Sequence, residues 1–228
     1  MEMTNFLMFL HCYAQYSYLV TYKLLDISIT FCIFVLQNKK KKFSHYMEDF
    51  IHLHVHTYYS ILDGQSPVQK IVDKAVVNGM RGMAITDHGN MFGVKELYNY
   101  CNKINGKLKD EGKEPFKPIF GCEMYVAHRR KSDRVKEKGD MGGYHLIVLA
   151  KNYKGYKNLI KLVSRAWVDG YYMRPRTDRE DLEKYHEDLI VCSACIAGEV
   201  PSKILKGDMA GAREALEWYK RVFGDDYY

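Results

Sequence analysis

Hydrophobic and polar positions follow two different periods from residue 47 onward. Short apolar or alternating runs predict strands, and longer runs with apolar positions three or four apart predict amphipathic helices. The predicted strands are Phe50–His56, Gly82–Thr86, Pro118–Val126, His145–Ala150 and Leu189–Ser193. Helices are predicted after Ser66-Pro67, where serine caps the helix and proline takes its first position, and around Leu97, Leu159 and Leu216.

This order of strands and helices predicts an α/β fold. A parallel sheet is expected, either as a barrel or as an open doubly wound sheet. Asn105–Lys117 and His128–Gly143 are polar and glycine-containing, which predicts surface loops. Neither G-x-G-x-x-G nor G-x-x-x-x-G-K-[ST] follows a predicted strand, so the usual glycine-rich nucleotide cradles are excluded.

Residues 1–46 differ in composition from the rest of the chain. All 17 glycines and all 5 prolines lie after Met47. A membrane anchor is one interpretation, because Met3–Tyr22 carries no formal charge, but polar residues dilute this run and Lys23 and Asp26 follow it. A secretory signal would need a basic start and a small-residue cleavage site. We favour a spurious extension with the true start at Met47, which the intact mass of the natural protein would test.

The overall composition is that of a globular protein, with 47% hydrophobic and 27% charged residues. The 34 basic and 28 acidic residues give a net charge of +6, which permits a polyanionic partner without requiring one. Six cysteines without a regular framework indicate a reducing compartment, so we expect a cytoplasmic protein.

Potential metal ligands lie mostly where the predicted strands end. His54 and His56 share one face of the first strand, because side chains at i and i+2 point to the same side. The other candidates are Asp63, His88, Glu123, His145 and Cys195. The carboxyl ends of parallel strands meet at one edge of a barrel, where chemistry gathers. His145 is an exception, since it opens its strand.

This donor set suits zinc, or a mixed cluster with iron or manganese. Glu123 in an apolar strand would be an unfavourable buried charge without a cation. Simpler interpretations stay open: a lone histidine is often a hydrogen-bonded core residue, and Asp63 precedes Gly64 as a turn residue would. Asp87 is interpreted as a partner that orients His88 rather than as a ligand.

Several segments resemble one known family. They are HLHVHTYYSILDG, ITDHGNMFG, KPIFGCEMYVA, HLIVLAKN, GYYMRPRTD and CSACIAGEVP. The H-x-H and TDHG strings resemble the PHP (polymerase and histidinol phosphatase) domain. The other segments are narrower and resemble the amino-terminal PHP domain of the alpha-subunit family of bacterial DNA polymerase III, over Phe50–Tyr228.

The resemblance implies a distorted (β/α)7 barrel with a cluster of up to three metals, commonly zinc, which in many bacteria acts as a 3′→5′ proofreading exonuclease. It implies that the seven candidates above match the family's first seven ligand positions. A bridging water of lowered pKa would then attack a phosphodiester. Arg174 and Arg176 of the YYMRPR string are expected to bind the DNA backbone, although a solvated loop is an equal alternative.

Two parts of the family pattern have no counterpart here: the last ligand pair, an Asp-x-His, and the palm domain with its catalytic aspartates. We therefore expect residues 47–228 to be a PHP domain that is incomplete at the C-terminus, from a DNA-directed DNA polymerase (a nucleotidyltransferase) of DNA replication. The partners implied are DNA and other holoenzyme subunits (sliding clamp, proofreading and clamp-loader subunits), with no membrane.

Two alternative functions stay open. One is a stand-alone PHP phosphatase that acts on a small monoester such as histidinol phosphate, against which the GNMFG and YYMRPR strings argue. The other is a non-catalytic scaffold that docks a proofreading subunit, against which the retained ligand positions argue.

Overall fold

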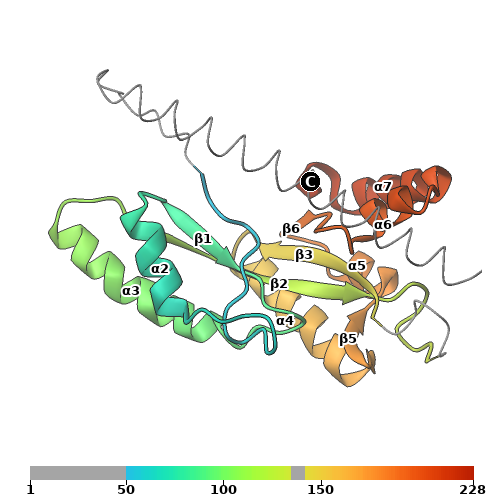
Figure 1. Ribbon diagram of the computed structural model, residues 1–228, viewed down its shortest axis with the longest axis horizontal. Coiled ribbons are helices and arrows are strands. Elements are labelled where there is room, and N and C mark those ends of the chain that lie inside the picture. The colour runs from blue at the N-terminus through green and yellow to red at the C-terminus, as the bar shows by residue number, and fades with distance from the viewer. Residues whose placement is uncertain (1–49, 135–141) are drawn as a thin grey trace, which may run out of the picture. The chain divides into compact units, whose positions relative to one another are not determined.

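In the computed structural model, the described residues, 50–134 and 142–228, form a mixed sheet flanked by helices (Figure 1). They belong to one unit of the chain, Asp49–Tyr228. The α/β class predicted from the sequence is confirmed. The predicted spurious extension, residues 1–46, lies outside the described residues.

Six strands and six α-helices follow one another in the described part of the chain. The strands are β1 (Gly82–Ile85), β2 (Lys117–Val126), β3 (Tyr144–Ala150), β4 (Tyr171–Tyr172), β5 (Arg174–Thr177) and β6 (Leu189–Cys192). The helices are α2 (Val68–Val77), α3 (Val94–Asp110), α4 (Tyr153–Val168), α5 (Arg179–Lys184), α6 (Glu199–Leu205) and α7 (Met209–Phe223), followed by a 3₁₀ turn, Gly224–Asp226. Within these described residues, no helix has the length and apolar character needed to cross a membrane.

The sheet is mixed rather than parallel. Its order is β4-β5-β2-β3-β6, and β1 pairs with the first part of β2. β1 and β5 run parallel to β2, whereas β3 runs antiparallel to both β2 and β6. β3 is the next strand after β2 along the chain and returns beside it in the opposite direction. As a result, the start of β3 lies beside the end of β2, with His145 opposite Tyr125.

The predicted first strand does not form a regular ladder. Residues 50–56 are extended beside β1 and pair with it only through a bridge between His52 and Met83. Backbone hydrogen bonds still hold the segment, because Ala84 N–H donates to His52 O at 2.8 Å and Thr86 N–H donates to Val55 O at 2.8 Å. The histidine-rich segment is therefore fixed against β1 although the pairing is too irregular for a strand.

Other differences from the predicted elements are local. α3 extends into the first part of the predicted loop and ends at Asp110, and Asn105 exchanges two hydrogen bonds with the backbone of Phe116. Pro67 rather than Ser66 is the N-cap of α2, with no side-chain cap. β4, β5, α5 and α6 were not predicted, because they are too short to show a period.

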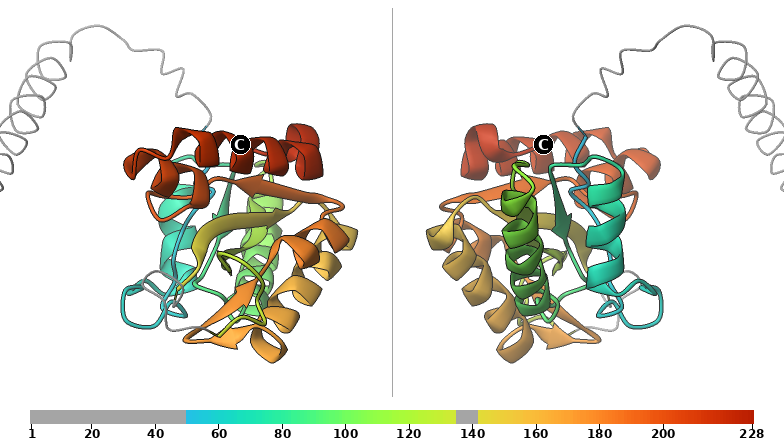
Figure 2. Two further views of the ribbon diagram at one scale, coloured as in Figure 1. Left: turned by 90° about the vertical axis from the view of Figure 1, so that its right-hand side faces the viewer. Right: turned by 90° about the vertical axis from the view of Figure 1, so that its left-hand side faces the viewer.

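The two faces of the sheet bury different residues. Cys122, Met124 and Val126 pack with α4, α5 and α7 in the largest core cluster, because alternate residues of β2 point to the same side. Glu123 and Tyr125 consequently face the opposite side, called here the inner face. Figure 2 shows α6 and α7 beside β6 at one end of the sheet, and α2 and α3 lying along β1.

The inner face also carries an apolar groove. A cavity of about 1080 Å³ is lined by side chains of β2, β3 and β6 and by the starts of α3 and α4. Its apolar lining includes Ile119, Leu149, Ile190 and Cys192. Tyr228 closes one side and pairs with β6, since its N–H donates to Val191 O at 2.9 Å.

Arg176 stabilises the fold from within. Its side chain is only 1% exposed, and its guanidinium donates hydrogen bonds to the carbonyls of Gly170, Lys131 and Asp133 at 3.3, 3.0 and 2.9 Å. The structure does not support the expected contact of Arg176 with DNA, because the group is committed to the protein backbone. Arg174, two residues earlier, is exposed.

We predict that Arg176→Lys lowers the free energy of unfolding by about 2–4 kcal/mol, because lysine lacks the planar fork that reaches several carbonyls at once. Arg174→Lys is the matched control and should change the value by less than about 1 kcal/mol, as expected of an exposed position. Urea unfolding followed by circular dichroism measures both. Equal effects of the two substitutions would contradict this role of Arg176.

Candidate metal centre

Glu123 lies at the middle of a cluster of imidazole, carboxylate and thiol groups. It projects from β2 onto the inner face, and its side chain is 1% exposed. The structure brings together the side chains of all the candidates named from the sequence around it. They are His54, His56, Asp63, His88, Glu123, His145 and Cys195. Metal binding itself stays a prediction.

The first possible ligand group contains His54, His56 and Glu123. The Nε2 atoms of the two histidines are 3.0 Å apart. His54 Nε2 lies 3.6 Å from Glu123 Oε1, and His56 Nε2 lies 3.4 Å from Glu123 Oε2. Three donor atoms that converge at these distances can hold one cation.

The second possible ligand group contains Glu123, His145 and Cys195. His145 Nδ1 lies 2.6 Å from Glu123 Oε1 and 3.9 Å from Cys195 Sγ. The antiparallel direction of β3 explains why His145 joins the cluster although it opens its strand. Glu123 belongs to both groups, so its carboxylate can bridge two cations.

His88 lies between two carboxylates. Its Nε2 is 2.6 Å from Asp63 Oδ2, and its Nδ1 forms an ion pair with Glu123 Oε2. Yet His88 Nδ1 and Glu123 Oε2 are buried and lack a partner in hydrogen-bond geometry. Buried polar atoms without hydrogen-bond geometry are atoms that a bound cation can satisfy. The donor set and these two atoms therefore fit a metal ion.

Burial and neighbouring charges shift the pKa values of several of these groups. Burial alone would raise the pKa of Glu123, but close contacts with His145 and His88 hold that pKa well below its usual range. Burial lowers the pKa of His54 and of His56, which keeps their imidazoles neutral at neutral pH. Contact with the Glu123 carboxylate raises the pKa of His88, so metal binding there displaces a proton.

The cluster is open to solvent on one side. The histidine side chains are 18–35% exposed and Asp63 is 59% exposed, whereas Glu123 is buried. A buried anionic centre with partly exposed ligands leaves room for water or substrate, as in catalytic rather than structural sites.

Asp87 acts through a neighbouring serine. Its buried carboxylate accepts hydrogen bonds from Thr57 N–H at 2.7 Å, Thr57 Oγ1 at 2.8 Å and Ser60 Oγ at 2.8 Å. Since the Ser60 proton is used on Asp87, Ser60 Oγ accepts from His56 Nδ1 at 2.9 Å. The structure thus differs from the expected role: Asp87 orients the ring of His56 through Ser60, and it does not contact the ring of His88.

Comparison with known proteins places the chain in a family. The model of the family described as "PHP domain" matches residues 52–228. The chain belongs to the PHP family. This was the family suggested by the H-x-H and TDHG strings, and the recognition is confirmed.

Two curated relatives of this PHP chain are named DNA polymerase III subunit alpha. The protein of Borreliella burgdorferi is 46% identical over 181 residues, which cover 78% of this chain and 15% of the relative. The protein of Treponema pallidum is 43% identical over 179 residues, which cover 78% of this chain and 14% of the relative. The chain therefore spans about one seventh of the length of these relatives.

A solved structure from Bifidobacterium adolescentis, assigned as a metal-dependent phosphoesterase, is 12% identical with a TM-score of 0.37 and covers 75% of this chain and 82% of the other. A TM-score this low does not establish a shared fold.

Sequence reasoning missed two neighbours of the PHP cluster. Ser60 lies four residues after His56. A serine is not among the usual metal ligands, so nothing in the sequence signalled it. Tyr125 lies two residues after Glu123 in the same strand, so the period of two places it on the same face. Its ring lies 5.2 Å from that of His145 and 6.2 Å from that of His88. Arg174 contacts it, with Nη1 donating to Tyr125 Oη at 3.1 Å.

We predict that Ser60→Ala weakens zinc or manganese binding by about 10–100-fold, the usual effect of losing a group that orients a metal-binding histidine. The alanine removes the acceptor for His56 Nδ1. Competition with a chromophoric chelator measures the affinity. Ser66→Ala is the control, because the backbone carbonyl of Ser66, which accepts from Tyr58 N–H at 3.0 Å, is kept by the substitution. An affinity of the Ser60 variant within threefold of the control would refute the orienting role.

Proposed function

We propose that this chain hydrolyses phosphodiester bonds of single-stranded DNA in the 3′→5′ direction, as the PHP domain of a DNA polymerase III alpha subunit. The observation that carries the proposal is the buried Glu123 carboxylate shared by two ligand groups. A phosphodiester has one negative charge shared by two non-bridging oxygens, together with a leaving oxygen, and paired cations suit such a substrate. The relatives named DNA polymerase III subunit alpha make DNA the substrate of choice.

The ligands proposed for the cluster are His54, His56 and Glu123 on one side and Glu123, His145 and Cys195 on the other, with His88 and Asp63 beside them. Zinc is the metal we propose, with manganese or iron as alternatives, since imidazole, carboxylate and thiolate suit all three. When bound, such metals lower the pKa of a coordinated water and neutralise charge on phosphate oxygens.

The chain's own residues have distinct tasks in this proposal. Glu123 supplies a buried negative charge and would help to hold the cations, while the partly exposed histidines leave the substrate side open. Ser60 and Asp87 fix the tautomer of His56 with its Nε2 lone pair toward the cluster. Arg174 is exposed at the edge and is proposed to bind a DNA phosphate, since its guanidinium stays within 5.2 Å of the Tyr125 ring that contacts His145.

The role of the longer relatives is proposed for the parent protein. We propose that it is a DNA-directed DNA polymerase of the cytoplasm that works with DNA and with other holoenzyme subunits, such as the sliding clamp, proofreading and clamp-loader subunits. The identity of 46% and 43% to proteins of that name supports this.

We also propose a finer fold and domain description. The mixed sheet would be part of a distorted (β/α)7 barrel whose further strands cover the apolar groove on the inner face. The parallel bridge between Val191 and Tyr227 supports this, because it extends the sheet beyond β6. Residues 47–228 would form the domain, and residues 1–46 an extension absent from the natural protein; the family match from residue 52 is consistent with this boundary.

The proposal predicts that the chain, loaded with zinc or manganese, shortens 5′-labelled single-stranded DNA from its 3′ end. Glu123→Gln should abolish the reaction, with a loss of at least about 100-fold, because both ligand groups lose their shared charge. Gel analysis of the products measures it. Glu217→Gln, at an exposed position of α7, is the matched control.

Three results would each speak against the proposal. A metal-loaded, folded chain without nuclease activity would contradict it. Hydrolysis of small phosphate monoesters without hydrolysis of DNA would favour a phosphatase instead. Equal activity of the Glu123 and Glu217 variants would show that the reaction takes place elsewhere or comes from a contaminant.

A further inference from the structure

Two exposed aromatic rings are stacked beside the metal centre. Trp167, at the end of α4, and Tyr171, in β4, have ring centroids 5.6 Å apart and planes at 21°. Their side chains are 44% and 49% exposed. Large aromatic side chains usually stabilise a protein by being buried, so a half-exposed stacked pair is suited to a ligand with a flat face.

The pair is attached to the loop that carries His88. Trp167 Nε1 donates to Gly89 O at 2.8 Å, and Gly89 directly follows His88. The same glycine packs against the β4–β5 hairpin, because a Cβ there would lie 2.6 Å from Pro175 Cγ and 3.1 Å from the Tyr125 ring. The φ of Gly89 is also positive, at +59°. The aromatic pair and the metal cluster are therefore connected through direct contacts.

Arg174, in the same hairpin as Tyr171, places a positive charge on the Tyr125 ring beside the cluster. Arg174 pairs with Tyr172 in the β4–β5 hairpin, and its guanidinium lies 5.2 Å from the centroid of the Tyr125 ring. The turn residue Met173 adopts φ 60° and is 62% exposed. Such a strained conformation in a non-glycine residue often marks a functional segment. The hairpin thus carries Tyr171, opposite Pro175, and Arg174, opposite Tyr172, within four residues of chain.

We propose that Trp167 and Tyr171 form a stacking site for the bases of a single strand of nucleic acid, while Arg174 binds a phosphate of the same strand next to the metal centre. The proposal rests on the proposed function and identifies how that site selects its substrate. Bases stack on aromatic rings regardless of sequence, and a nearby arginine adds backbone attraction. In a duplex the bases already stack on one another, so the site selects single strands.

A protein partner is the competing occupant of this surface. The combination of a stacked pair, an adjacent cation and contact with a phosphodiesterase-type centre favours nucleic acid, because each part matches a different group of the strand. A protein-binding surface would need no charge beside the cluster. The following test separates the two.

Trp167 can report its own ligand. The chain has 2 tryptophans, and the other, Trp218, is buried at 5% exposure. We expect an oligothymidylate to quench the tryptophan fluorescence of the full chain in the presence of EDTA, where no metal-dependent cleavage occurs. An abasic oligonucleotide of equal length offers the same phosphates without bases and should leave the fluorescence unchanged. A blunt duplex should quench at least fivefold less.

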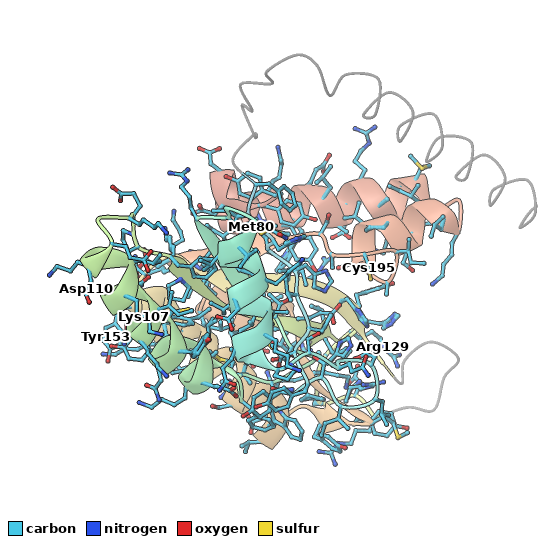
Figure 3. All side chains as sticks on the ribbon, turned by 60° about the vertical axis from the view of Figure 1, so that its left-hand side comes forward. Met80, Lys107, Asp110, Arg129, Tyr153 and Cys195 are labelled. Atoms are coloured by element: carbon cyan, nitrogen blue, oxygen red, sulfur yellow. The ribbon has the colours of Figure 1, made fainter. Side chains whose placement is uncertain are left out.

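Tyr171 is the residue to change, because Trp167 remains as the reporter. Tyr171→Ala should weaken binding of the oligothymidylate at least fivefold, whereas Tyr171→Phe, which keeps the ring, should stay within twofold of the unchanged chain. Tyr153→Ala is the control: Tyr153 is 70% exposed at the other end of α4, far from Cys195 of the cluster (Figure 3). Circular dichroism checks that each variant folds.

Several outcomes would overturn the proposal: no quenching by the oligothymidylate, equal quenching by the abasic strand, or equal weakening by Tyr171→Ala and Tyr153→Ala. Because the assay contains no metal, its result is independent of the nuclease test. Quenching without nuclease activity would keep the stacking site and refute only the reaction. Nuclease activity without quenching would refute the stacking site alone.

Discussion

The buried carboxylate of Glu123 is the constraint on which the rest of the centre depends. A charge that is 1% exposed is unfavourable unless positive groups surround it. Burial alone would raise the pKa of Glu123, but contacts with His145 and His88 lower it, and the carboxylate stays ionised. Metal ions would meet the same requirement more strongly than protonated imidazoles. The surrounding histidines are consequently arranged around one acid rather than around one another.

The sheet topology brings the groups that surround Glu123 to one place. Three segments far apart in the sequence must bring donors to one carboxylate, and the reversal of β3 delivers His145 to the end of β2. The extended segment beside β1 delivers His54 and His56 without becoming a regular strand. The segment lacks the regular hydrogen bonds of a strand, but the ring of His56 is still fixed. Ser60 Oγ donates to Asp87 and accepts from His56 Nδ1.

The sequence predicted which side chains the structure brings together better than it predicted the geometry of the fold. Glu123 is recognisable because an acid in an apolar strand contradicts its environment, and His88 is recognisable because it follows directly after the end of a predicted strand. Strand direction is different, since the period of β3 is the same whether it runs parallel or antiparallel. The short elements β4, β5, α5 and α6 have too few residues to show a period at all, and they form because neighbouring strands and helices pair or pack with them.

Arg174 and Arg176 show where sequence reasoning reaches its limit. The two residues have the same charge, lie in one motif and differ by two positions in β5. Only the tertiary structure separates them, because Arg176 is buried and donates to three backbone carbonyls, whereas Arg174 is exposed and contacts Tyr125. The buried arginine holds the segment after β2 to the hairpin, and this fixed hairpin is what keeps the exposed arginine and Tyr171 beside the cluster. The proposed binding residue Arg174 thus depends on the structural residue Arg176, which fixes the position from which Arg174 can act.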